Sequence, residues 1–128
     1  MKAPHQRLGH LGEEAAATHL RKKGYKILER NYVCGHKEVD IIAEQNGTLV
    51  FVEVKTRTYT SGNLHKYGRA CLSVDGEKRR NLFAVALFYQ NKYHRGKRIR
   101  FDVIEVYYNA NDPESPFSLH PMPDAFRA

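Results

Sequence analysis

Apolar and polar residues follow two periods along the chain, one helical and one extended. Residues 7–23 and residues 78–91 have apolar positions at helical spacing, which predicts two helices. Gly24 follows a basic last turn and ends the first helix. The apolar stripe of the first helix contains Leu8, Leu11, Ala15, Ala16 and Leu20. The buried face of the second helix contains Leu82, Val85, Ala86 and Tyr89.

Four segments have the alternation that indicates β-strands: residues 25–32, 38–45, 48–55 and 98–107. Asn46-Gly47 separates the second strand from the third. Both central residues of a type I′ turn have positive φ, and Asn-Gly is a preferred pair there. We therefore predict an antiparallel hairpin. One of its faces, expected to pack against a helix, contains Val39, Ile41, Ala43, Val50, Val52 and Val54.

The two-residue turn determines which residues of the hairpin face each other. The predicted pairs are Gln45 with Thr48, Ile42 with Phe51, Asp40 with Glu53, and Glu38 with Lys55. Opposed residues have Cβ atoms about 4.5–5.5 Å apart, and like charges at that separation repel. Asp40 opposite Glu53 therefore costs stability. A divalent cation between the two carboxylates would remove the repulsion.

Mg²⁺ or Mn²⁺ is the cation that we expect these residues to bind. Hard cations take oxygen ligands, and Mg²⁺ needs only one or two protein carboxylates when substrate phosphates complete its shell. The expected ligands are Asp40, Glu53 and the carbonyl oxygen of Val54. Such an ion polarises a phosphate and helps to generate hydroxide from water. Lys55, on the same face as Glu53, would orient the attacking water or offset charge on the phosphate.

These charged residues also have structural explanations. Glu38 and Lys55 would form an ordinary cross-strand ion pair, contributing about 0.2–1 kcal/mol. Glu13, early in the first helix, would be favoured there by the helix dipole. The basic residues 78–80 open the second helix, where the dipole disfavours them. That placement favours phosphate binding, with a solvated helix face as the alternative.

The net charge of +7 is concentrated in the middle of the chain. Residues 54–100 carry twelve Lys or Arg and only two acidic residues, whereas residues 1–53 are nearly neutral and residues 101–128 are acidic. A basic region beside a carboxylate cluster indicates binding to a nucleic-acid backbone, and we predict DNA. The predicted nucleic-acid-binding residues are Arg57, Lys66, Arg69, Lys78, Arg79 and Arg80.

Length and element order predict one α/β domain. The order helix, three strands, helix, strand gives a central mixed β-sheet flanked by helices. We assign residues 1–108 to this domain, and residues 109–128, with four of the five prolines, to an extended C-terminal tail. No apolar run approaches the roughly 20 residues of a membrane span. We expect a cytoplasmic protein without a membrane partner, with Cys34 and Cys71 as reduced thiols and the histidines at the surface.

Six short motifs follow one another along residues 7–107. They are Gly9-x-x-Gly12-Glu13-x-x-Ala16, Gly24-Tyr25-x-Ile27-Leu28-x-Arg30-Asn31, Glu38-Val39-Asp40-Ile41-Ile42-Ala43, Val50-Phe51-Val52-Glu53-Val54-Lys55-Thr56-Arg57, Lys78-Arg79-Arg80 and Arg100-Phe101-Asp102-Val103-Ile104. In this order they resemble the YraN-like family of small bacterial proteins. One position departs from the family pattern, because Lys37 stands where a glycine usually precedes the Glu-x-Asp motif.

The YraN-like family is counted in the PD-(D/E)xK, or restriction-endonuclease-like, superfamily and is similar to archaeal Holliday-junction resolvases. The resemblance implies the superfamily fold, a central mixed sheet with a helix on each side. It assigns Asp40, Glu53 and Lys55 to the catalytic motif, and Glu13 to an additional acid on the first helix. Because a junction resolvase needs two active sites, the analogy also implies a homodimer.

Three functions are compatible with these observations. The first is a metal-dependent endonuclease that hydrolyses DNA phosphodiesters, with branched or junction DNA as the narrower expectation. The second is a nucleic-acid-binding protein that keeps the nuclease scaffold without cutting on its own. The third is a small adaptor that docks on another protein through its tail or long loop. We rank them in that order.

Overall fold

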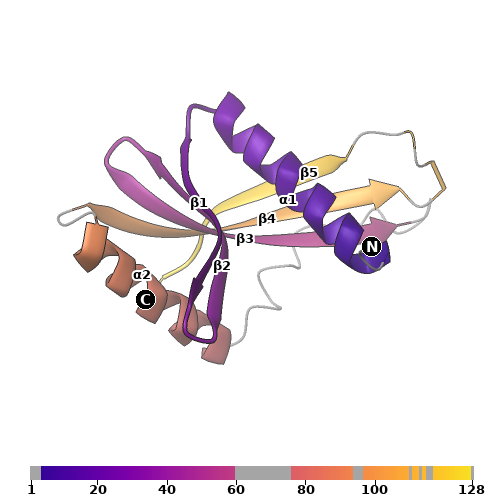
Figure 1. The fold of residues 1–128 in the computed structure, drawn as a ribbon. Helices are drawn as coiled ribbons and strands as arrows, with labels where there is room; N and C mark the ends of the chain where they lie inside the picture. Colours follow the sequence, from indigo (N-terminus) through magenta and orange to yellow (C-terminus); the bar gives the residue numbers. More distant parts are fainter. Residues whose placement is uncertain are drawn as a thin grey trace.

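The computed structural model describes residues 4–59, 76–93, 97–109, 111–112, 114 and 117–127. Two helices and five strands occur within these residues (Figure 1). They are α1 (Pro4–Lys22), β1 (Lys26–Cys34), β2 (Lys37–Gln45), β3 (Thr48–Tyr59), α2 (Gly76–Tyr93), β4 (Arg98–Asn109) and β5 (Ser118–Phe126). The predicted helix-flanked mixed sheet is confirmed, with one more strand than the sequence indicated.

All five strands belong to one sheet in the order β1-β2-β3-β4-β5. The pair formed by β3 and β4 is parallel, and the other three neighbouring pairs are antiparallel. A parallel pair needs a crossover connection. The segment between β3 and β4 contains α2, which packs on the sheet.

The β2–β3 hairpin has the turn that its sequence predicts. Asn46 and Gly47 have φ values of 52° and 78°, the positive values required in a type I′ turn. Gln45 pairs with Thr48 and Ile42 pairs with Phe51, as predicted. The register of the turn half of the hairpin is therefore confirmed.

The two strands separate at the far half of the hairpin. Their recorded pairing ends at Ile41 with Val52, so the predicted pairs of Asp40 with Glu53 and of Glu38 with Lys55 are wrong as backbone partners. Figure 1 shows the lower part of the β1–β2 hairpin turning away from β3. Within the gap, the backbone N–H of Val54 donates to Oδ2 of Asp40 at 2.7 Å. A carboxylate thus accepts the hydrogen bond that a β2 carbonyl would accept in a continued ladder.

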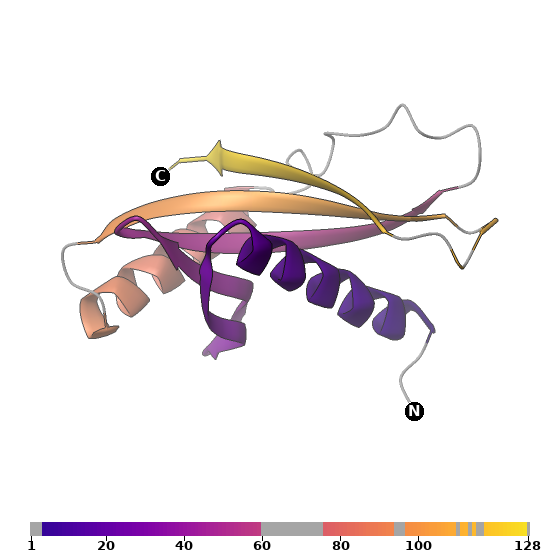
Figure 2. The ribbon, with the colours of Figure 1, turned by 90° about the horizontal axis from the view of Figure 1, so that it is seen from above.

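The fifth strand was not predicted. We expected residues 109–128 to form an extended tail, but Ser118–Phe126 pairs with β4 and completes one edge of the sheet (Figure 2). Pro121 and Pro123 argued against a strand because proline has no N–H to donate. An edge strand tolerates proline, because only one of its sides takes part in the ladder.

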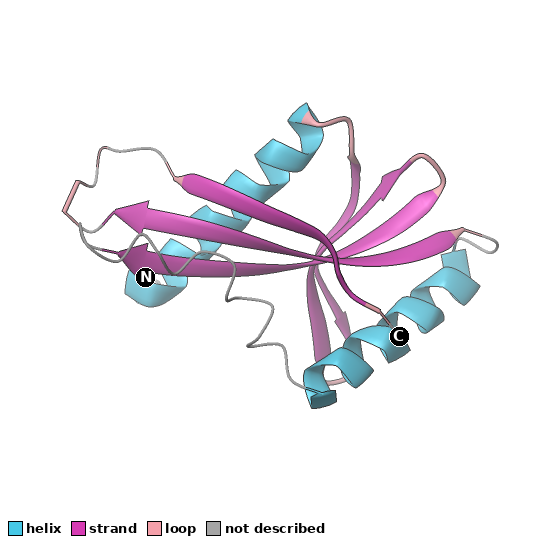
Figure 3. Ribbon diagram, turned by 180° about the vertical axis from the view of Figure 1, so that it is seen from behind, coloured by secondary structure: helices cyan, strands magenta, loops and turns pink. Residues whose placement is uncertain are grey.

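The two helices cover opposite faces of the twisted sheet (Figure 3). On one face Ala16, Ala17 and Leu20 of α1 pack against β2, β3 and β4. On the other face the predicted residues of α2 are buried, namely Leu82, Val85, Ala86 and Tyr89. Among the described residues, neither helix has the length and apolar character needed to cross a membrane.

Two side-chain positions differ from the sequence pattern. Leu11 was assigned to the buried stripe of α1 but is 46% exposed. Val39 was placed on the same hairpin face as Ile41, yet Val39 packs in the α2 cluster and Ile41 in the α1 cluster. Strict alternation therefore fails across Asp40, at the point where β2 leaves β3.

Candidate functional site

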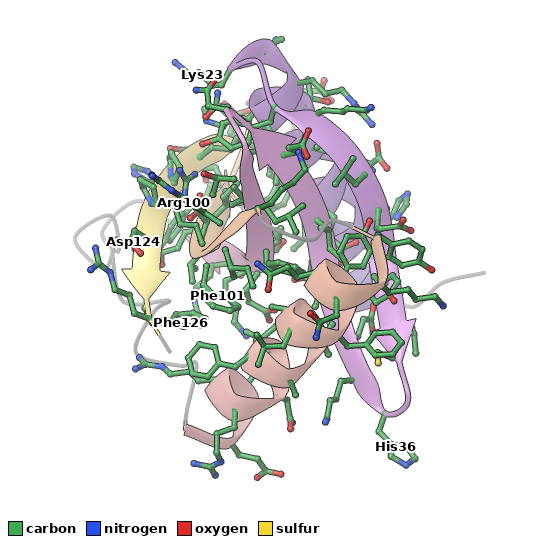
Figure 4. All side chains as sticks on the ribbon, turned by 90° about the vertical axis from the view of Figure 1, so that its left-hand side faces the viewer. Lys23, His36, Arg100, Phe101, Asp124 and Phe126 are labelled. Atoms are coloured by element: carbon green, nitrogen blue, oxygen red, sulfur yellow. The ribbon has the colours of Figure 1, made fainter. Side chains whose placement is uncertain are left out.

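The separation of β2 and β3 opens a cleft that contains the two predicted acids. Its volume is about 290 Å³, and its lining includes Asp40 from β2, Glu53 from β3 and Lys78 from α2. Glu38 lines the same cleft, together with His36, Lys37 and Asn81. Figure 4 shows His36 at the tip of the β1–β2 hairpin. The cleft thus lies between the end of that hairpin, the middle of β3 and the first turn of α2.

The environment of Asp40 favours its protonated form. Burial and, after it, the charge of the nearby Glu53 carboxylate raise the pKa of this carboxyl to about 7. The hydrogen bond from Val54 acts oppositely, because it stabilises the charged form. Glu13 is also near enough for its charge to raise the pKa of Asp40. The predicted repulsion between acids is therefore present, although it does not arise from direct cross-strand pairing.

Glu53 has two lysine partners. It is 6% exposed, and its Oε1 lies 3.4 Å from Nζ of Lys55. The same oxygen accepts a hydrogen bond from Nζ of Lys78 in a second ion pair. The alternative ion pair of Lys55 with Glu38 is therefore replaced by one with Glu53. Two ammonium groups on one buried oxygen neutralise Glu53 and place surplus positive charge at the cleft.

The two lysines differ in their protonation. Burial and the hydrogen bond with Lys78 lower the pKa of Lys55, although Glu53 opposes this effect. Burial alone would lower the pKa of Lys78 as well, but its hydrogen bonds to Glu53 and Lys55 outweigh burial and raise it. Lys55 is consequently the lysine that loses a proton more readily.

The donor atoms at the cleft fit a hard divalent cation that is completed by water or phosphate. Asp40 and Glu53 supply two carboxylates, the number that Mg²⁺ commonly takes from protein. The N–H of Val54 points toward Asp40, and the carbonyl of a strand residue points to the same side as its N–H. Among the described residues no group of three or more His, Cys, Asp or Glu side chains is arranged to bind a metal ion. The donors that fit such an ion are the Asp40 and Glu53 carboxylates, which line the cleft, and the carbonyl of Val54, whose N–H contacts Asp40.

Helix α1 approaches this region from the other face of the sheet. A Cβ atom added to Gly12 would overlap the Thr56 hydroxyl of β3 and lie 3.1 Å from the Cβ of Thr56, so only glycine permits this contact. The next residue, Glu13, is held beside the cleft. Burial raises the pKa of Glu13 and the Glu38 charge adds to this, whereas Arg30 and Asn31 oppose it. When the Asn31 amide is oriented to donate, its nitrogen lies 3.1 Å from Oε2 of Glu13 and 3.3 Å from Oε1 of Glu38.

Comparison with known proteins agrees with this arrangement of motifs. The model of the Uncharacterised protein family UPF0102 matches residues 12–106, a range that contains Glu13, Asp40, Glu53, Lys55 and Lys78. The chain belongs to this family. Within the UPF0102 family, a protein of Syntrophus aciditrophicus is 45% identical over 101 residues, covering 78% of this chain and 76% of that protein. The resemblance to the YraN-like family is thereby confirmed.

Two further UPF0102 proteins match this chain over nearly the whole length of both proteins. A protein of Geobacter metallireducens is 39% identical over 127 residues, which is 98% of this chain and 97% of that protein. A protein of Phocaeicola vulgatus is 36% identical over 124 residues, covering 97% of this chain and 95% of the relative. Both relatives are called UPF0102 proteins. These matches extend over β5 as well as the cleft.

The predicted nucleic-acid-binding residues of this UPF0102 protein are in different environments. Arg57 on β3 and Arg80 on α2 are exposed. Arg79 is half-buried, with its guanidinium 5.1 Å from the centre of the Phe126 ring. Lys78 lines the cleft that contains Asp40 and Glu53, called the acidic cleft below, and forms an ion pair with Glu53. The two further predictions, Lys66 and Arg69, lie outside the described residues.

Some residues at the site of this UPF0102 protein were not found from sequence. Lys78 was predicted as a phosphate-binding residue and not as a partner of Glu53. Glu105 is fully buried, is the β4 partner of Lys55 in the register, and accepts a hydrogen bond from the Tyr107 hydroxyl at 2.8 Å. An acid at an apolar position of a strand is the signal that could have identified Glu105. His36 lines the cleft from a turn and gave no comparable signal.

Proposed function

We propose that this protein is a metal-dependent endonuclease that hydrolyses phosphodiester bonds in DNA. The observation that supports this most strongly is the presence of half-buried Asp40 and buried Glu53 in one cleft, with Lys55 paired to Glu53. A carboxyl whose pKa is raised to about 7 by burial and by a neighbouring acid is typical of functional sites, since stability alone would select against it. A bound divalent cation would turn this repulsion into attraction.

Each residue of the cleft has a separate task in the proposed reaction. Asp40, Glu53 and the Val54 carbonyl would hold Mg²⁺ or Mn²⁺, an ion that polarises a phosphoryl oxygen and lowers the pKa of bound water. Lys55 would orient the attacking water through its Nζ, and its lowered pKa makes the neutral form of that nitrogen, which can accept a proton, more accessible. Lys78 would stabilise negative charge on the phosphate. Glu13 would supply a further carboxylate from α1.

Basic residues on the elements that form the cleft support a nucleic-acid substrate. The chain has a net charge of +7, and the excess lies in residues 54–100. Exposed Arg57 and Arg80 come from the two elements that carry Glu53 and Lys78. Phosphate contacts of this kind position DNA without reading its sequence. The narrower proposal is cleavage of branched DNA by a homodimer, with one cleft acting on each of two strands.

A cleavage assay tests the proposal. Labelled duplex, single-stranded and four-way-junction DNA are incubated with the protein and with Mg²⁺ or Mn²⁺. We expect cleavage that requires metal and falls by about 100-fold or more in Asp40→Asn and in Lys55→Ala. Asn at position 40 retains an acceptor for the Val54 N–H, so this variant separates chemistry from folding. Failure to cut any substrate, or undiminished cutting by Asp40→Asn, would reject the nuclease proposal.

A second function, nucleic-acid binding without cleavage, is favoured by one specific observation. Lys55 and Lys78 both form ion pairs with Glu53, so its charge is balanced by the protein's own lysines. A cleft neutralised in this way can present lysines to a phosphate backbone without hydrolysing it. Metal-independent DNA binding that survives Asp40→Asn, together with no cleavage, would support this second function over the first.

A further inference from the structure

A second cavity lies apart from the acidic cleft and shares none of its lining residues. Its volume is about 560 Å³, and it lies between the middle of α2, the beginning of β4 and the end of β5. Its lining is mainly apolar and includes Phe83, Ala86, Leu87, Phe101 and Phe126. Figure 4 shows Phe101 and Phe126 at this end of the sheet, with Arg100 and Asp124 beside them. Leu87 is 55% exposed, so apolar surface continues from the cavity onto the helix.

The aromatic rings of the cavity are packed mainly against each other. Phe101 and Phe126 are stacked with ring centres 5.3 Å apart, and Phe83 meets Phe101 edge-on at 4.9 Å. The Arg79 guanidinium lies over the Phe126 ring at 5.1 Å. These contacts occupy ring faces that a nucleic-acid base would need for stacking. The remaining ring edges and aliphatic groups suit an inserted apolar side chain.

Arginines surround this apolar cavity. Arg98, Arg100 and Arg127 line it, and Asp124 is the one acidic residue among the described residues of its lining. Arg100 is fixed by two hydrogen bonds to Asp102, both at 2.8 Å, and by one to the Tyr25 hydroxyl at 2.7 Å.

The other two arginines are more open to a new partner. Arg127 pairs with Asp124, but its side chain is 82% exposed, and exposed ion pairs contribute little to stability. Arg98 is exposed and has no carboxylate partner among the described residues. Arg98 and Arg127 can therefore bind incoming carboxylates with little loss of existing contacts.

We propose that this cavity is a docking site for a short acidic peptide segment of a partner protein. An apolar side chain of the segment would enter the cavity beside Leu87, and neighbouring carboxylates would bind Arg98 and Arg127. Arginine suits this role because its planar fork binds carboxylates through two hydrogen bonds. The proposal does not depend on nuclease activity, because the cavity and the acidic cleft have no lining residue in common.

A peptide-binding measurement tests this site. The probe is a fluorescein-labelled peptide in which a run of Asp and Glu is followed by Leu-Phe, titrated with the full chain and followed by anisotropy. We expect saturable binding at micromolar protein, weakened about tenfold or more by Leu87→Glu and by Arg98→Glu. Replacing the peptide's acids by Asn and Gln, or its Leu-Phe by Ser-Ser, should weaken binding to a similar degree.

Matched controls distinguish this site from general charge attraction. Phe88→Glu changes an exposed apolar residue next to Leu87 that does not line the cavity, so peptide affinity should stay within about twofold. Equal losses in Phe88→Glu and Leu87→Glu, or no saturable binding, would overturn the proposal. It would also be overturned if Leu87→Glu abolished binding of a labelled oligonucleotide, or dissolved a dimer in sedimentation, instead of weakening peptide binding.

Discussion

The surroundings of Asp40 have opposite effects on the pKa of its carboxyl. Its carboxylate accepts the Val54 N–H, which favours the charged form, while burial and Glu53 favour the neutral one. Burial and repulsion prevail, and the pKa of Asp40 rises to about 7. Near neutral pH, small changes in pH therefore change the charge of the cleft.

This raised pKa predicts how stability depends on pH. Between about pH 4 and pH 7 the folded protein holds a proton on Asp40 that the unfolded chain releases, so the folded state loses stability as pH rises through this window. Asp40→Asn removes that loss. In metal-free buffer we expect its free energy of unfolding, relative to the original protein, to be higher at pH 8 than at pH 4.5 by about 3 kcal/mol. Urea denaturation at the two pH values measures the difference.

Glu14→Gln is the control for this measurement. Glu14 pairs with Arg30 at 2.9 Å on the surface, and this hydrogen bond and charge lower the pKa of Glu14. Its replacement should give no gain in stability at high pH. If Asp40→Asn changed the free energy of unfolding equally at both pH values, the raised pKa would be wrong.

The sequence predicts contacts of the site between residues that are close along the chain, and it does not predict contacts between distant segments. Asp40, Glu53 and Lys55 belong to one hairpin, so its turn brings them to one region, although the strands separate before Asp40 and Glu53 can pair. Lys78 reaches Glu53 only because α2 packs on the sheet, and no periodicity within residues 78–91 encodes that contact. The raised pKa of Asp40 likewise depends on burial, which follows from packing and not from residue order.

At the scale of the elements, the close contact between α1 and β3 brings Glu13 to the cleft. Gly12 lies against Thr56 with no room for a side chain, and the following residue is Glu13. Gly9, one turn earlier in the same helix, has no atom within 4 Å of an added Cβ. Close packing therefore excludes a larger side chain at position 12 and leaves space for one at position 9, although both glycines lie in the same helix.

Alanine substitutions separate these two glycines. Gly12→Ala should destabilise the protein by about 1–3 kcal/mol, because overlap with Thr56 outweighs the better helix propensity of alanine. Gly9→Ala should be neutral or stabilising by up to about 1 kcal/mol. Thermal and urea unfolding measure both, and Thr56→Ala should restore part of the loss in Gly12→Ala. A Gly12→Ala protein as stable as Gly9→Ala would show that the contact does not exist.

The elements themselves were predictable where the local signal was strong. Asn46-Gly47 and the α2 face gave the correct turn and the correct buried residues. Alternation failed at Val39 because β2 leaves its partner strand at Asp40, which a period of two does not anticipate. The strand β5 was missed because its prolines argue against pairing, whereas its edge position permits them.

At the scale of the whole molecule, charge is distributed unevenly. Lys22 ends α1, Lys23 follows it, and both are exposed. Figure 4 shows Lys23 at the opposite end of the protein from His36 of the cleft. Arg57 and Arg80 are exposed on the elements that form the cleft. If DNA binds over the cleft, Arg57 and Arg80 should contribute to DNA affinity, whereas Lys22 and Lys23 should not.

Salt dependence of DNA binding tests this difference. The logarithm of the association constant should fall linearly with the logarithm of salt concentration, because bound phosphates release counterions. Arg57→Ala and Arg80→Ala should each reduce the slope by about 1, whereas Lys22→Ala with Lys23→Ala should leave it unchanged. Fluorescence anisotropy with labelled duplex in EDTA measures the slope. Equal effects of the two pairs would indicate binding without a preferred face.

The hydrogen bond from Val54 to Asp40 has a consequence for how relatives are interpreted. An aliphatic residue at position 40 would leave the Val54 N–H without its acceptor where the strands separate, so Asp or Asn is favoured there for the fold alone. A descendant that had lost its chemistry would still be selected to keep that acceptor. An Asp or Asn kept at this position in a relative would then indicate that the sheet has the same shape. Retention or loss of Lys55 would be the better indicator of the proposed nuclease activity.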